Sequence, residues 1–138
     1  MGRFGMVLLA LASAVFVPAE ATAYDPCYNF DGSTVRVIDR GGRFSITFDE
    51  PSEDLQAAGV RPGSVLVFGT SSNGALYGTA RHYAQGCVGR PDQYVVTGGY
   101  QQDYSIILNG VRDVRDECRA TGSTVADELS FSFLGPCR

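Results

Sequence analysis

Turn steps that contain glycine divide this chain into short apolar runs, and their spacing limits what the chain can fold into. Gly41-Gly42, Asn73-Gly74 and Asn109-Gly110 each separate two such runs. Both residues of a two-residue hairpin turn need a positive φ, which Gly and Asn adopt at the least cost. The three steps therefore predict three β-hairpins, each with antiparallel strands on either side of its turn.

Several of the runs alternate apolar and polar side chains. In residues 44–48 the three apolar side chains share one face, and residues 129–133 alternate in the same way. Alternation with a period of two is typical of a half-buried strand. The strands expected from these patterns are 34–38, 44–48, 65–68, 76–80, 94–97, 104–108, 111–114 and 129–133.

Seven or eight strands joined mostly by tight turns predict an all-β fold. We expect a small antiparallel up-and-down β-barrel, because closure removes the exposed strand edges that an open sheet would leave. A two-sheet β-sandwich is the alternative. Residues 51–59 depart from the pattern and predict one short helix. Ser52 can cap its start, and Gly59 can end it.

The first residues have the features of a secretory signal. Arg3 supplies a positive charge, residues 6–17 are apolar, and Ala21-Thr22-Ala23 fits the small-x-small rule for cleavage. An uncleaved membrane anchor is the alternative, but an anchor needs about 20 apolar residues. We therefore expect a signal peptide over residues 1–23 and a single exported domain over residues 24–138, periplasmic or secreted, without a membrane span.

Four cysteines lie in the expected mature domain: Cys27, Cys87, Cys118 and Cys137. An even number in an exported chain predicts two disulfides, for which three connectivities are possible. We favour Cys87–Cys118 with Cys27–Cys137, because the second pair would join the two ends of the domain and close a very long loop. Zinc is disfavoured, since the chain has no CxxC pair and one histidine. We expect no metal and no cofactor.

The charge of the chain disfavours some partners. It carries 11 basic and 15 acidic residues, which gives a net charge of −4. A nucleic-acid partner is not expected, because phosphate neutralisation needs a basic face. Residues 49–54 are the densest acidic stretch, but they lack the spacing of a calcium loop, so we interpret them as a solvated helix start. The mixed charges of residues 112–119 indicate an exposed strand or loop.

His82 is the only histidine, and it shares a strand face with Leu76, Gly78 and Ala80. It could act as a general base in a barrel mouth, although a hydrogen-bonded or surface histidine is the simpler interpretation. Tyrosines offer flat contact area and a hydroxyl at binding surfaces, but they are also ordinary strand residues. No catalytic residue is assigned. The candidate binding residues are Tyr77, His82, Tyr83, Tyr94 and Tyr104.

Two resemblances accompany these patterns. Residues 74–80 (GALYGTA) and 93–100 (QYVVTGGY) are similar to two adjacent strands of avidin-like barrels. That resemblance implies a barrel but not biotin binding, since the avidin family surrounds biotin with tryptophans and this chain has none. The second resemblance is to an uncharacterised family of small exported bacterial β-proteins. It rests on residues 58–63, 77–80, 87, 94–98, 108, 118 and 127–131, and it implies a Cys87–Cys118 bridge and no known catalytic residue.

These observations support three functional hypotheses. The first is a non-enzymatic exported binding module whose partner is a protein, such as an enzyme to be inhibited, or a component of the cell envelope. A rigid, disulfide-bonded frame suits this role, because it holds a contact surface without an ordering cost. The alternatives are a small-ligand carrier of the lipocalin or avidin type, and an enzyme that uses His82.

Overall fold

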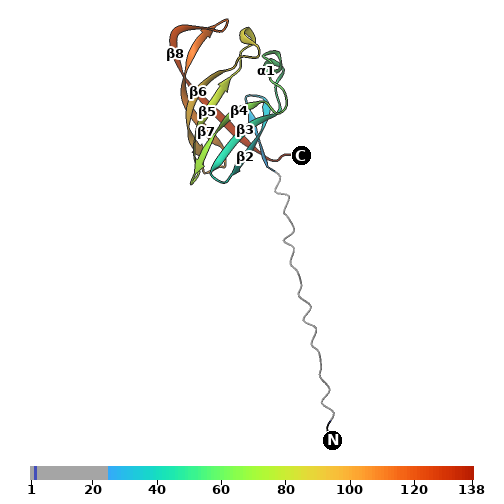
Figure 1. Cartoon of the computed structure of the whole chain (residues 1–138). Helices are drawn as coiled ribbons and strands as arrows, with labels where there is room; N and C mark the ends of the chain where they lie inside the picture. The colour runs from blue at the N-terminus through green and yellow to red at the C-terminus, as the bar shows by residue number, and fades with distance from the viewer. Residues whose placement is uncertain (1, 3–24) are drawn as a thin grey trace.

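The computed structural model describes Gly2 and residues 25–138, so the expected signal peptide over 1–23 lies outside the described residues except for Gly2. Residues 25–138 form a closed antiparallel barrel, in which each strand pairs with its neighbours in the chain and β1 pairs with β8 (Figure 1). The predicted all-β barrel is confirmed, and the alternative of a two-sheet sandwich is not observed. The elements are β1 Pro26–Phe30, β2 Ser33–Arg40, β3 Arg43–Glu50, α1 Glu53–Ala57, β4 Val65–Ser72, β5 Ala75–His82, the 3₁₀ turn η1 Gln85–Cys87, β6 Asp92–Tyr100, β7 Ile106–Asp116 and β8 Arg119–Pro136.

Two of the three predicted hairpin turns are confirmed. Gly41 and Gly42 join β2 to β3 with φ of 62° and 78°. Asn73 and Gly74 join β4 to β5 with φ of 50° and 82°. These are left-handed conformations that Gly and Asn tolerate, so the residue types of the two dipeptides were sufficient to predict the positions of the turns.

The third predicted turn, at Asn109-Gly110, is wrong. Both residues lie inside β7, where Gly110 pairs with Val96 on one side and with Asp127 on the other. A Cβ at Gly110 would lie 3.0 Å from the Tyr94 side chain, so the glycine permits a close approach of β6 rather than a reversal of the chain. The reversal comes later, at Glu117 and Cys118, which have φ of 43° and 69°.

Strand boundaries differ from the predictions at two further places. Tyr104, predicted to begin a strand, lies in the loop between β6 and β7 with a φ of 66°, and β7 begins at Ile106. β1 was not predicted, because its sequence lacks a clean alternation. It forms because β2 and β8 supply backbone partners on both of its edges, so its extended conformation depends on tertiary pairing.

The inward side chains of the strands fill the barrel. On β3 the buried residues are Phe44, Ile46 and Phe48, which confirms the predicted alternation. On β8 Phe131 is completely buried and stacks on Phe30, with ring centroids 5.0 Å apart. The barrel interior is therefore a packed apolar core over most of its length.

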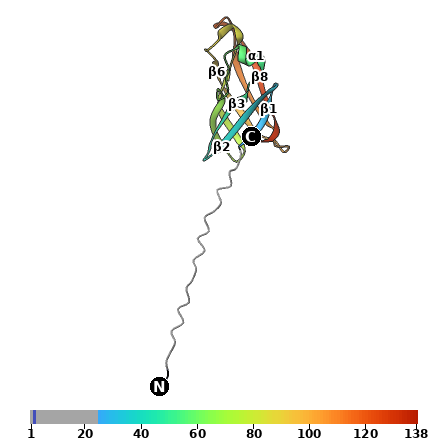
Figure 2. The same ribbon diagram turned by 90° about the vertical axis from the view of Figure 1, so that its right-hand side faces the viewer.

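The two ends of the barrel are built differently. One end, which we call the helix end, carries α1, η1 and the far parts of β7 and β8 (Figure 1). The C-terminus lies near the opposite end (Figures 1 and 2). There the Cys27–Cys137 disulfide joins the start of β1 to the end of the chain, and at the helix end Cys87–Cys118 joins η1 to the β7–β8 turn. Both predicted disulfides are confirmed.

The short predicted helix is also confirmed. The Ser52 hydroxyl accepts a hydrogen bond from the Leu55 amide at 3.4 Å, and Glu53 and Asp54 lie in the first turn, where the positive end of the helix dipole favours them. Within the described residues, no helix has the length and apolar character needed to cross a bilayer. Helix α1 matters for function because of where it lies: it covers part of one barrel mouth.

Candidate functional site

The barrel core stops short of the helix end, where a cavity of about 500 Å³ opens. This volume lies within the usual range for sites that bind small molecules, roughly 300 to 1,000 Å³. Its apolar wall is contributed by Phe30, Phe48, Leu55, Leu66 and Leu129. The polar lining residues are Asp31, Arg81, His82, Tyr83, Tyr94, Arg112, Asp127, Glu128 and Ser130. The apolar side chains thus come mostly from β1, β3, α1 and β4, and the polar ones come mostly from β5 to β8.

Three side chains from adjacent strands form a hydrogen-bonded polar group in this cavity. The Tyr94 hydroxyl on β6 donates a hydrogen bond to Asp127 Oδ2 on β8 at 2.6 Å. Arg112 Nε on β7 donates to the same oxygen at 3.2 Å. Burial raises the pKa of Tyr94 well above its usual value of 10.0, and the hydrogen bond to Asp127 raises it further, so the tyrosine is neutral. This cluster presents a neutralised ion pair to the cavity.

His82 lies beside this cluster, at the end of β5. Burial lowers the pKa of His82 below its usual value of 6.5, and the positive charge of Arg112 lowers it further. The carboxylates of Asp127 and Asp92 act in the opposite direction but more weakly. The imidazole is therefore held in its neutral form. A neutral imidazole offers one hydrogen-bond donor and one acceptor, both suited to an uncharged polar ligand.

The structure brings three of the five predicted binding residues to the cavity. His82, Tyr83 and Tyr94 line it. The Tyr83 hydroxyl donates to the Val65 carbonyl at 2.6 Å, so this side chain supports the wall rather than offering a free hydroxyl. Tyr77 points outward from β5 and is 59% exposed, because it has the opposite strand parity to His82.

Tyr104 also lies away from the cavity. It is 73% exposed and sits in the loop that connects β6 to β7. That loop is at the barrel end opposite the cavity, because β6 runs away from the helix end. Its neighbours are the rings of Phe133 and of Tyr28, whose hydroxyl donates to the Tyr104 carbonyl at 3.0 Å. Tyr77 and Tyr104 thus do not contribute to the site around His82.

Sequence reasoning missed Arg112 and Asp127. Arg112 was interpreted as part of an exposed charged stretch that followed a turn at Asn109-Gly110. Because β7 is continuous, the inward alternation of Ile106 and Leu108 extends through Gly110 to Arg112. The alternation of inward side chains in residues 106–112 is a signal for Arg112. It can be read from the sequence only if the strand is known to continue through Asn109-Gly110.

A second, smaller pocket of about 200 Å³ adjoins the first. It lies between the η1 loop and the far part of β7 with the turn at Glu117 and Cys118, and both pockets share His82 and Arg112 as lining residues. Its remaining lining includes Arg90, Asp92 and Arg115. The shared residues place His82 and Arg112 where the barrel mouth meets a side opening.

The lowered pKa of His82 predicts a measurable pH dependence of stability. The folded state binds a proton on His82 less readily than the unfolded chain does. This histidine therefore leaves stability unaffected above pH 6.5, and it lowers stability as the pH falls through 6.5 until the folded-state pKa is passed. Chemical denaturation between about pH 7.5 and about pH 5 should show a shallower loss for His82→Asn than for the wild type. Equal pH dependence in the two proteins would contradict a neutral, half-buried His82.

No group of three or more metal-ligating side chains occurs in the described part of the chain. Searches against protein-family models, curated protein sequences and solved structures found no significant match to this chain. The two resemblances stated from the sequence therefore stay predictions.

Proposed function

We propose that this protein is an exported, non-enzymatic binding module that holds a small amphipathic molecule in the cavity at the helix end. The observation that carries the proposal is the cavity of about 500 Å³, which is lined by apolar side chains mostly from β1, β3, α1 and β4 and by polar side chains mostly from β5 to β8. Two disulfides support an oxidising location outside the cytoplasm. The closed barrel supports a binding role, because a rigid wall keeps the site open without an ordering cost.

The cluster of Tyr94, Asp127 and Arg112 favours an uncharged head group on the ligand. Arg112 neutralises Asp127, and His82 beside them is held neutral, so a charged group placed against this cluster would lose its hydration without gaining a net opposite charge there. Asp127 Oδ2 accepts both hydrogen bonds of the cluster, and within residues 25–138 Oδ1 accepts none, so Oδ1 is the acceptor that a ligand donor would use. An amide, alcohol or similar head with a donor and an acceptor fits this arrangement.

A binding role is favoured over catalysis by the surroundings of His82. Within residues 25–138, its imidazole makes no hydrogen bond to Asp92, to Asp127 or to a hydroxyl group. A general base is normally oriented by such a partner. Turnover of a substrate by the purified domain, abolished by His82→Ala, would replace this proposal with the enzymatic hypothesis.

Filling the cavity should weaken binding of a neutral amphipathic probe. Leu55→Trp adds a large ring from α1 into the cavity, where it would occupy space that the probe needs. We expect the Kd of N-phenyl-1-naphthylamine to rise by at least about tenfold, which corresponds to a loss of roughly 1.4 kcal/mol in binding free energy. Val95→Trp is the matched control, because it adds a large ring on the outer face of β6, where Val95 is 54% exposed. Fluorescence titration of the wild type and both variants provides the comparison.

Two results would contradict the cavity proposal. One is a wild-type domain that does not bind the probe. The other is a Val95→Trp variant that loses as much affinity as Leu55→Trp, since this would place the probe on the surface. Native mass spectrometry of protein purified from its own host provides an independent measurement, in which a co-purifying small molecule supports the proposal.

A protein partner is the second candidate, and one observation favours it. Phe68 on β4, Val95 on β6 and Val111 on β7 are 39%, 54% and 62% exposed, and Thr79 of β5 pairs with both Phe68 and Val95. Apolar side chains grouped on an outer face can mark a protein contact. In a pull-down from the native envelope, loss of a retained protein in Val111→Glu, with the probe affinity of the cavity unchanged, would support this candidate.

A further inference from the structure

The hairpin formed by β7 and β8 extends beyond the barrel. The last backbone pair between β6 and β7 is Val96 with Gly110. The β7–β8 ladder continues past that point, from Val111 paired with Ala126 to Asp116 paired with Arg119. Residues 111–126, which we call the arm, therefore have backbone strand partners only within the arm itself.

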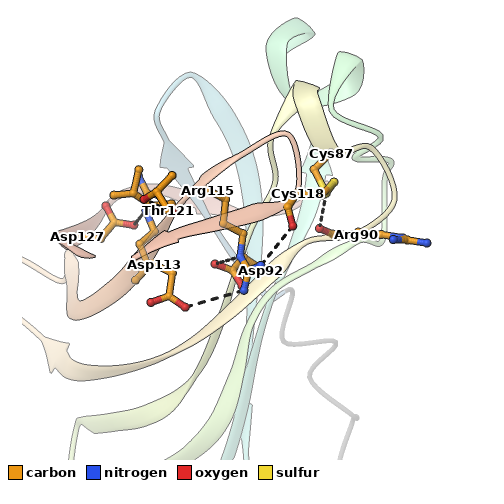
Figure 3. Close-up of polar contacts among 10 residues, drawn as sticks. Cys87, Arg90, Asp92, Asp113, Arg115, Cys118, Thr121 and Asp127 are labelled. Carbon is orange, nitrogen blue, oxygen red and sulfur yellow. Dashed lines mark hydrogen bonds and ion pairs between the residues drawn. A yellow bond between two sulfur atoms is a disulfide. The ribbon is translucent and has the colours of Figure 1, made fainter. Parts of the chain in front are cut away.

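The tip of the arm is held to the rest of the domain at two places. Cys118 is joined to Cys87 by a disulfide, next to η1. Arg115 Nε lies 3.0 Å from Asp92 Oδ2 at the start of β6 (Figure 3). The Arg115 side chain is 39% exposed, so solvent and salt weaken this ion pair. The covalent bridge is consequently the main attachment of the arm tip.

The arm lies over the openings of the proposed site. It contributes Arg112 to the lining of the main cavity. It also contributes one side of the smaller pocket, from Arg112 to Cys118, and the loop around η1 contributes the facing side. A bridge between Cys87 and Cys118 thus joins the two sides of the opening across its outer edge.

The two disulfides of the domain differ in accessibility. Cys27 and Cys137 are 6% and 3% exposed, and they lie at the opposite end of the barrel. Cys87 and Cys118 are only half-buried. A thiolate must reach a sulfur atom before exchange can begin, so the half-buried bridge is the more reducible one.

We infer that the Cys87–Cys118 disulfide is a redox-sensitive latch that controls access to the cavity at the helix end. An external dithiol reduces the bridge by thiol–disulfide exchange, through a mixed disulfide on Cys87 or Cys118. The products are two cysteine thiols on the chain and one cyclic disulfide on the reductant, a transfer of two electrons and two protons. The freed arm moves away from η1, and the ligand is exchanged faster. This inference rests on the proposed function.

The first test compares the oxidised wild type with Cys87→Ser/Cys118→Ser. Hydrogen exchange followed by mass spectrometry should show that the arm amides, residues 111–126, exchange by a local opening and gain more in rate than the amides of β2 and β3, whose rates rise only with the loss of global stability. Stopped-flow release of N-phenyl-1-naphthylamine should be at least about tenfold faster from the variant, since differences between related complexes lie mostly in dissociation. Unchanged arm exchange, or an unchanged release rate, would overturn the latch.

The second test asks whether the latch responds to a reductant. The wild type is titrated with dithiothreitol, trapped with an alkylating agent and mapped by mass spectrometry. We expect Cys87 and Cys118 to be alkylated at lower reductant concentration than Cys27 and Cys137, and simultaneous reduction would overturn redox control. If the probe bound neither the wild type nor the double-serine variant, the proposed function would be contradicted. The hydrogen-exchange rate of the arm amides would still decide whether the bridge holds the arm in place.

Discussion

Replacing Cys27 and Cys137 together with alanine is expected to lower the free energy of unfolding by about 5 kcal/mol. The sequence separation of this pair is 110 residues, so its bridge closes almost the whole domain. In the chain-entropy model, a loop of this length restricts the unfolded state by about that amount. Urea denaturation of the variant and the wild type, monitored by circular dichroism, measures the difference directly.

The other disulfide supplies the matched control. Cys87 and Cys118 are separated by 31 residues, for which the same model gives about 4 kcal/mol. The Cys27/Cys137 variant should therefore be the less stable of the two, and its buried side chains add to the difference. A reversed order would show that loop entropy does not govern the stabilisation by these bridges.

Phe131→Ala is expected to cost about 3 to 5 kcal/mol, the usual range for removing a large aromatic side chain from a core. Phe131 is completely buried on the inner face of β8, and its ring stacks on Phe30. Truncation removes the stacking and leaves a cavity among side chains of a closed barrel that can relax only in part. Thermal and denaturant unfolding of the purified variant gives the value.

Phe133→Ala is the control for this effect. Phe133 lies two residues further along the same strand, with the same parity, but it is 49% exposed near the end of the barrel. It contacts Tyr28 edge-on at 5.5 Å between ring centroids. We expect a much smaller loss of stability than for Phe131→Ala. Equal losses in the two variants would mean that burial on this face does not set the cost.

Comparison of the sequence with the structure shows where local patterns suffice. The alternation in residues 44–48 placed β3 and its buried face correctly, and Ser52 marked the start of α1. The same Asn-Gly signal was correct at residues 73–74 and wrong at residues 109–110. The difference is tertiary, because Gly110 is flanked on both sides by paired strands and lies under the Tyr94 ring.

The candidate site was predicted only in part for the same reason. Strand parity placed His82 on the same face of β5 as Leu76, Gly78 and Ala80, and that face is the inner one, whereas no face was predicted for Tyr94 on β6. Arg112 and Asp127 reach the cavity only because β7 and β8 continue beyond the point where the sequence suggested a turn. Their hydrogen bonds with Tyr94 depend on the register of three strands, which no single segment encodes.

The sequence by itself determined the all-β class, most of the strands, two hairpin turns and the short helix, because these depend on φ preferences and on alternation within a few residues. Only the tertiary structure decided the closure between β1 and β8, the cavity at the helix end and the arm that borders it. The physical reason is that closure and cavity volume depend on pairing register and side-chain filling around the whole ring. Those quantities are set by residues far apart in the chain, and local patterns carry no information about them.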